Sequence, residues 1–137
     1  MADSPFVDAV RHHLVSEGWM TARTRVNDAT AVVRALREDG RGPSRVLVMV
    51  VDDPDAAVVT DHVARLVAGA ERRDAAALLT SLATVTDRAH RTADARGVAV
   101  VAPAIFRDSS VETTVLEILE ADRRGDDGEV VEPADEP

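Results

Sequence analysis

Apolar residues along this chain form short uninterrupted runs and stripes at helical spacing, and both occur together in its second half. Residues 75–81 and 98–101 are apolar runs, which suit strands covered on both faces of a sheet. Between them lies a helix that Thr84 or Thr86 can cap at its start, with Gly97 at its end. Its apolar face consists of three residues at intervals of four: Val85, Ala89 and Ala93. The pattern therefore predicts two parallel strands joined by a right-handed crossover.

The chain before this unit reads as a helix, three strands and a second helix. Ser4 can cap the first helix. Its buried face consists of four apolar residues: Phe6, Val7, Val10 and Leu14. Residues 20–26 alternate as in an edge strand, whereas residues 45–51 form an apolar run typical of a buried strand. The second helix begins at Thr60 or Asp61. Its predicted buried face again has four members: Val63, Leu66, Val67 and Ala70.

Residues 27–36 allow two interpretations. The apolar positions of this segment fit a helical stripe: Ala29, Val32, Val33 and Leu36. The Thr-Ala-Val-Val core and the Asp39-Gly40 turn after it fit a strand that enters a hairpin. We predict the strand, because residues 45–51 supply a pairing partner across residues 38–44.

The chain after residue 101 is expected to end in a helix and a tail. Residues 102–108 predict a loop. Ser109 and Glu112 form a capping-box pattern, which predicts a helix to about Ala121. Its apolar residues are Val111, Val115, Ile118 and Leu119. The order (αβββαβαβα) predicts one α/β domain over residues 1–121, with a central mixed sheet of about five strands flanked by helices. Residues 122–137 are polar and acidic, which predicts a disordered tail.

Composition narrows the functional classes. The chain has 137 residues and no Cys, which excludes disulfides, a thiol nucleophile and thiolate metal sites. No apolar run is long enough to cross a membrane, and the start does not resemble a signal peptide. We therefore expect a cytoplasmic protein that is not bound to a membrane.

The charged residues indicate the salt concentration in which this protein folds. All 16 basic residues are Arg, and the chain has 25 acidic residues, for a formal net charge of −9. This acidic, Lys-free composition resembles that of proteins from extreme halophiles. Because the Debye length at about 1 M salt is only about 3 Å, such a surface repels itself little there. We expect a halophilic archaeal protein whose fold depends on salt.

Several capping and packing motifs resemble one nuclease family. Gly18-Trp19 matches the Gly-aromatic step that ends the family's first helix. The family's V-x-x-L-x-G/A helix matches Val63, Leu66 and the Gly69-Ala70 pair, and its capped, Ala-faced helix matches Val85-Thr86-Asp87-Arg88-Ala89 with Ala93, followed by Gly97-Val98. In these motifs, over residues 6–106, the chain resembles the Mrr-type branch of the restriction-endonuclease-like (PD-(D/E)xK) superfamily. The resemblance implies a restriction-endonuclease-like α/β fold.

The resemblance also implies where a metal site would lie. The family places one carboxylate at the start of its second strand, and an acid or Gln, one spacer and a Lys at the end of its third. These carboxylates hold Mg²⁺, which activates the attacking water. Asp28 matches the first position, whereas the second motif falls on Met49-Val50-Val51 in a chain without Lys. Asp52 and Asp53 are the remaining remnant candidates. Arg34 or Arg45 could supply a cation, but a guanidinium replaces the water-positioning Lys poorly.

Other candidate sites are weaker. The histidines are adjacent or isolated in sequence, which argues against a metal site: His12, His13, His62 and His90. Four arginines on neighbouring predicted strands could form a basic stripe for nucleic acid: Arg23, Arg25, Arg34 and Arg37. Three apolar residues could form an exposed homodimer face: Trp19, Ile105 and Phe106.

Three functions follow from these observations. The first is a nuclease-like domain that has lost catalysis and its metal and binds nucleic acid or protein. The second is an active, Mg²⁺-dependent DNA endonuclease with a displaced site at Asp28, Asp52 and Asp53. The third is a small homo-oligomeric α/β regulatory protein. We predict the first, with no catalytic residue and no cofactor, and with DNA or a second copy as the partner.

Overall fold

The computed structural model describes residues 4–38 and 45–107. The elements are α1 (Pro5–Ser16), β1 (Met20–Asn27), β2 (Thr30–Leu36), β3 (Arg45–Val51), α2 (Thr60–Arg72), β4 (Ala76–Ser81), α3 (Asp87–Arg96), β5 (Ala99–Val101) and α4 (Ala104–Arg107). From α1 to β5 this is the predicted order. The predicted loop over residues 102–108 is wrong in part, because it contains the short helix α4. The predicted helix over residues 109–121 and the tail over 122–137 lie outside the described residues.

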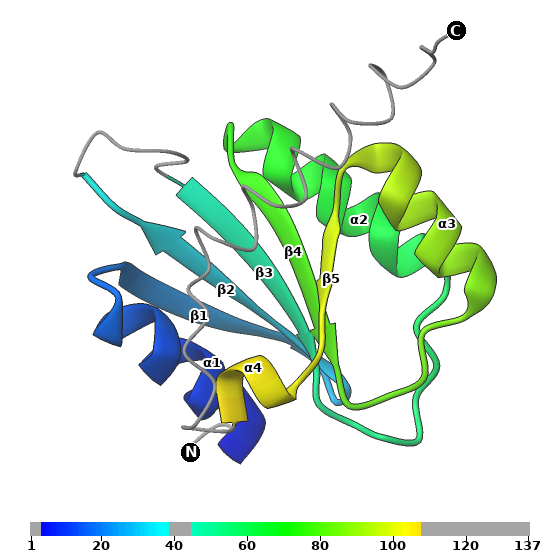
Figure 1. The fold of residues 1–137 in the computed structure, drawn as a ribbon, viewed down its shortest axis with the longest axis horizontal. Coiled ribbons are helices and arrows are strands. Elements are labelled where there is room, and N and C mark those ends of the chain that lie inside the picture. Colours follow the sequence, from blue (N-terminus) through cyan, green and yellow to red (C-terminus); the bar gives the residue numbers. More distant parts are fainter. Residues whose placement is uncertain (1–3, 39–44, 108–137) are drawn as a thin grey trace, which may run out of the picture.

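The strands form one mixed sheet in the order β1-β2-β3-β4-β5 (Figure 1). The first three strands are antiparallel, and β4 and β5 continue parallel to β3. Residues 30–36 therefore form a strand, as predicted, because β2 pairs with both β1 and β3. The parallel pair β4–β5 and its crossover helix α3 are also as predicted. The expected central mixed sheet of five strands flanked by helices is confirmed.

Helices cover the two faces of the sheet differently. One face carries α1 and α4, whose apolar residues form a core with alternate strand residues such as Val48 and Leu78. The other face carries α2 and α3, which pack on the intervening residues such as Met49 and Leu79. Each fully buried Val or Leu stabilises the fold by about 1.5–3 kcal/mol. The aromatic-poor sequence therefore builds two cores from Val, Ala and Leu.

Capping residues fix where the helices begin and end. Ser4 caps α1 by accepting a 3.3 Å hydrogen bond from the Val7 amide. Thr86, and not Thr84, caps α3, with 3.1 Å between its hydroxyl and the Ala89 amide. Gly97 ends α3 with φ +75°, a conformation that glycine adopts without strain.

The predicted exposed homodimer face is wrong. Trp19 is only 2% exposed and Phe106 7%, and both belong to the core beneath α1. Ile105 is partly buried against the same core. The reason is α4, which packs on α1 and brings the Phe106 ring edge-on to His13, with 5.2 Å between ring centroids.

Half of one sheet face has no helix above it among the described residues. Helices α2 and α3 lie over β3, β4 and β5, as Figure 1 shows. On the same face, Met20 and Val26 of the edge strand β1 remain 58% and 53% exposed. In the part of the chain that the structure describes, no helix is long and apolar enough to cross a membrane.

Candidate functional site

The predicted remnant residues lie at one edge of the sheet. Strands β2 and β3 are antiparallel, so the start of β2 meets the end of β3, with Thr30 opposite Val51. The Asp52 amide extends this pairing by donating to the Ala29 carbonyl at 2.9 Å. Asp28 and Asp52 are therefore brought to the same edge of the sheet.

Asp52 is held by an arginine at this edge. The two Arg25 Nη atoms donate to the two carboxylate oxygens of Asp52 at 2.9 and 2.7 Å. The Asp52 side chain is only 5% exposed, whereas that of Arg25 is 34% exposed. The hydrogen bonds from Arg25 lower the pKa of Asp52, against the opposing effect of burial. Both carboxylate oxygens thus bind a guanidinium where a metal would need them.

The neighbouring polar residues stabilise turns. Asp53 Oδ1 accepts from the Asp55 amide at 2.9 Å, and its carbonyl accepts from Ala56. Asn27 likewise accepts from the Ala29 amide at 2.9 Å across Asp28, which is exposed. These are local side-chain caps of turns, which Asn and Asp favour.

The end of β3 offers no ligand or base. Met49, Val50 and Val51 are all buried, with Met49 and Val51 in the core beneath α2 and α3 and Val50 in the core beneath α1. Within residues 4–38 and 45–107, no group of three or more His, Asp or Glu side chains could hold a metal ion. The edge therefore has carboxylates but no convergent metal site.

The histidines act singly. His13 lies 2.6 Å from the Glu17 carboxylate on α1. His62 accepts a 3.1 Å hydrogen bond from the Val59 amide and so caps the start of α2. His12 is exposed on α1, and His90 is exposed on α3. The four histidines therefore lie at separate places, and only His13 and His62 make the contacts described above.

The predicted basic stripe is divided between the two sheet faces, so that prediction is wrong. Ala22 lies opposite Arg34, whereas Arg23 lies opposite Val33. Residues opposite one another point to the same face, so Arg23 and Arg34 point to different faces. Arg23 also pairs with Asp8 at 2.8 Å. Arg37 lies 5.8 Å from the ring of Trp19.

A different set of arginines surrounds the uncovered half of the sheet. Two adjoining pockets of about 460 and 380 Å³ lie there, and both are bordered by Arg34, Leu47 and Arg73. Among the described residues, every charged residue that lines them is an arginine: Arg34, Arg45, Arg65, Arg72 and Arg73. We call this surface the arginine groove. An all-arginine lining is unexpected in a chain whose acids outnumber its arginines 25 to 16.

Helix α2 and strand β3 position most of these arginines. The last turn of α2 ends in Arg72, and Arg73 follows as its cap, where cations complement the helix dipole. Arg45 donates to the Arg73 carbonyl at 3.1 Å, and Arg73 to the Gly69 carbonyl at 3.2 Å. A Cβ on Gly69 would lie 3.0 Å from Leu47, which shows how closely α2 approaches the sheet.

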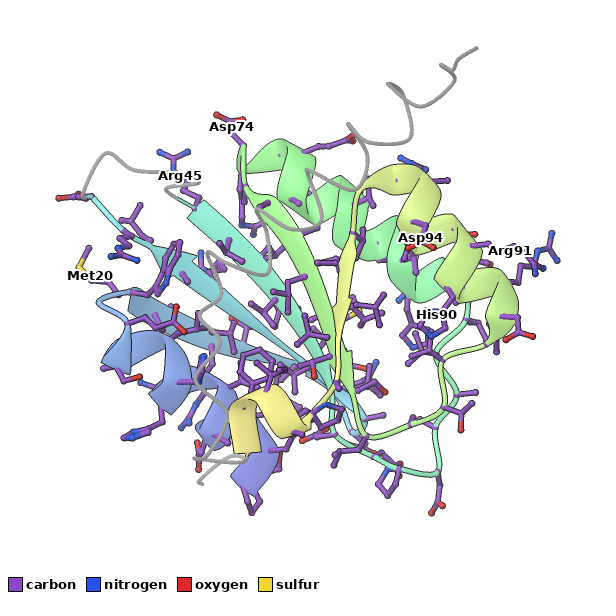
Figure 2. All side chains as sticks on the ribbon, viewed as in Figure 1. Met20, Arg45, Asp74, His90, Arg91 and Asp94 are labelled. Carbon is purple, nitrogen blue, oxygen red and sulfur yellow. The ribbon has the colours of Figure 1, made fainter. Side chains whose placement is uncertain are left out.

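Two of the five arginines have no polar partner within the described ranges: Arg34 and Arg72. Arg65 pairs with Asp61 at 2.9 Å, but both side chains are largely exposed, so the pair is weak. The floor of the groove includes four apolar residues: Met20, Val26, Val32 and Leu36. Figure 2 shows Met20 and Arg45 projecting at the same end of the sheet.

Sequence reasoning missed this groove, although a signal was present. Arg65, Arg72 and Arg73 are spaced i, i+7 and i+8, which places them on one side of a helix. Arg34 joins them only because β2 pairs with β3 in the observed register, with Arg34 opposite Leu47.

Comparisons with known proteins are sparse. No protein-family model matches the sequence, and no curated protein matches it. Among solved structures, the MspJI restriction endonuclease in complex with a 27-mer oligonucleotide aligns with a TM-score of 0.47 and 18% identity. The alignment covers 94% of this chain and 30% of that chain, so this chain spans less than a third of the length of that protein. A likeness with this TM-score and identity carries no conclusion about the family or the chemistry of this chain.

Proposed function

We propose that this chain is a restriction-endonuclease-like domain of the Mrr type that binds nucleic acid without cutting it, in the cytoplasm of a halophilic archaeon. The capping and packing motifs support the family, and the Lys-free acidic composition supports the origin. The observation that carries the functional proposal is the contrast between the two sites. At the sheet edge that carries Asp28 and Asp52, which we call the carboxylate edge, both carboxylate oxygens of Asp52 already bind Arg25. In the arginine groove, by contrast, Arg34 and Arg72 have no polar partner within the described residues.

The carboxylate edge supports the loss of cleavage. Mg²⁺ binds carboxylate oxygens, and those of Asp52 are already bonded to Arg25. Replacing that guanidinium with a metal would leave Arg25 without its carboxylate partner and would require further ligands. Asp28 is the other carboxylate that the family pattern places at this edge, but buried apolar side chains occupy the end of β3.

The arginine groove supports binding to a phosphate backbone. Guanidinium groups bind phosphate through paired N–H donors, and within residues 4–38 and 45–107 no carboxylate lines this groove to compete with the phosphate. The net charge of −9 opposes binding elsewhere on the surface. Binding should therefore depend on this one surface and on the salt concentration.

A gel assay tests both halves of the proposal. The full chain is incubated with plasmid DNA and with Mg²⁺ or Mn²⁺, at the lowest salt in which it stays folded. We expect the plasmid to be retarded and to remain supercoiled. Cleavage that Asp28→Ala abolishes would instead establish the active endonuclease with a displaced site at Asp28, Asp52 and Asp53.

A further inference from the structure

The floor of the arginine groove needs an apolar ligand. Met20 and Val26 lie more than half exposed on it, beside the partly buried Val32 and Leu36. Nucleic-acid phosphates would bind the surrounding arginines but would leave these side chains in water. Exposed apolar side chains with a polar border are typical of a protein-protein interface. The groove is therefore built for a segment that is both apolar and acidic.

The sequence of this chain contains such a segment. Residues 109–121 carry apolar side chains at helical spacing, namely Val111, Val115, Ile118 and Leu119. The same residues include three Glu and no Arg: Glu112, Glu117 and Glu120. A segment with this pattern, docked as an amphipathic helix, would bind in a groove through its apolar anchors, and its acids would complement arginines at the border.

Within one copy, the chain that leads to this segment lies on the other face of the sheet. Helix α4 ends at Arg107 and packs on α1, which covers the face opposite the groove. Arg107 is followed by Asp108 and then by Ser109. To reach the groove of its own copy, the chain would have to pass from one face of the sheet to the other. The groove of a second copy can instead be placed beside the face that carries α4.

We propose that the arginine groove is the docking site for residues 109–121 of a second copy of this chain. Two copies exchange these segments reciprocally, which closes a symmetric dimer without further copies. This inference goes beyond the proposed function and does not need it. Where both hold, the acidic segment and nucleic acid compete for the same arginines, so nucleic acid favours the undocked state.

The absence of Cys from the chain permits a direct test. Full-length Met20→Cys and Val26→Cys proteins are each mixed with a full-length Ile118→Cys protein of different tag size, and disulfide formation is followed under mild oxidation. We expect at least one pair to form a mixed disulfide at least tenfold faster than the control pair. The control is Val15→Cys with Ile118→Cys, because Val15 is similarly exposed but lies on α1.

Equal rates for all pairs would overturn the proposal. It would also be overturned if Met20→Cys and Ile118→Cys, combined in one chain, closed only as a monomer, because the segment would then dock within its own copy. A third contrary result is that duplex DNA protects Met20→Cys from alkylation while no mixed disulfide forms. That result would leave the nucleic-acid function standing. Mixed disulfides with no retardation of DNA would overturn the function and leave the dimer.

Discussion

At the scale of residues, the pair between Arg25 and Asp52 decides the chemistry of the carboxylate edge. Its two hydrogen bonds give the carboxylate a fixed partner, and charge-assisted bidentate pairs are among the strongest side-chain contacts. Because Arg25 is about one-third exposed, the pair is worth about 1 kcal/mol, more than a loose surface pair but less than a buried one.

The Arg25→Ser variant should be less stable than the wild type, and this loss of stability should be larger at neutral pH than in acid. The lowered pKa of Asp52 contributes stability at pH values above the ordinary aspartate pKa of about 3.9. That contribution is lost as the pH falls through the lowered pKa. Urea unfolding should therefore show a loss of about 1 kcal/mol at pH 7 and a smaller loss near pH 2.

Arg23→Ser is the matched control for this change, because Arg23 sits on the same strand and pairs with the more exposed Asp8. Its effect at pH 7 should be smaller. An equal loss of unfolding free energy in both variants would show that the burial of Asp52 does not strengthen its pair with Arg25.

At the scale of elements, capping and burial decide where each helix lies. The Thr86→Ala variant should lose about 1 kcal/mol of unfolding free energy, because its hydroxyl caps α3 through the Ala89 amide. Thr84→Ala is the control, since Thr84 contributes its backbone carbonyl, which accepts from Val58, and alanine keeps that group. Chemical unfolding measures both, and a larger loss for Thr84→Ala would refute the assigned cap.

Much of the fold could be predicted because local sequence patterns determine where several of its strands and helices lie. The run over residues 45–51 and the Ala face of α3 needed no tertiary information, and Gly97 marked the end of that helix. Thr84 and Thr86 were equivalent in sequence, since only the folded loop decides which hydroxyl reaches an amide. The burial of Trp19 and Phe106 was missed because α4 folds back on α1, a contact between distant segments.

The candidate site was less predictable, because it depends on strand register. Asp28 and Asp52 could be placed at one edge from the antiparallel pairing alone. The partner of Asp52 could not, because Arg25 is 27 residues away in sequence. The same limit applies to Arg34, which the sequence grouped with Arg23 and the register places on the opposite face.

At the scale of the whole molecule, the net charge sets the conditions in which the fold and its binding can be studied. The chain has 137 residues, no Lys and a formal net charge of −9. Repulsion among its acidic side chains therefore opposes the compact state until salt screens it. The arginine groove is lined by arginines within the described residues, and screening weakens any phosphate contact that it makes.

Thermal unfolding followed by circular dichroism should show a midpoint that rises from low to multimolar salt, because salt screens the repulsion among the acids. Potassium chloride and sodium chloride should act alike if screening is the cause. A midpoint that is unchanged across this range would contradict the halophilic origin.

The most direct test of a non-cleaving domain that binds nucleic acid through the arginine groove is the salt dependence of duplex DNA binding. It is measured by fluorescence anisotropy for the wild type, for Arg34→Ser/Arg72→Ser and for Arg91→Ser. Arg91 is exposed on α3, away from the groove (Figure 2). Each lost phosphate contact flattens the plot of log affinity against log salt by about 0.9. We predict a slope smaller by about 2 for the groove variant and an unchanged slope for Arg91→Ser, whereas equal slopes for all three proteins would contradict the account.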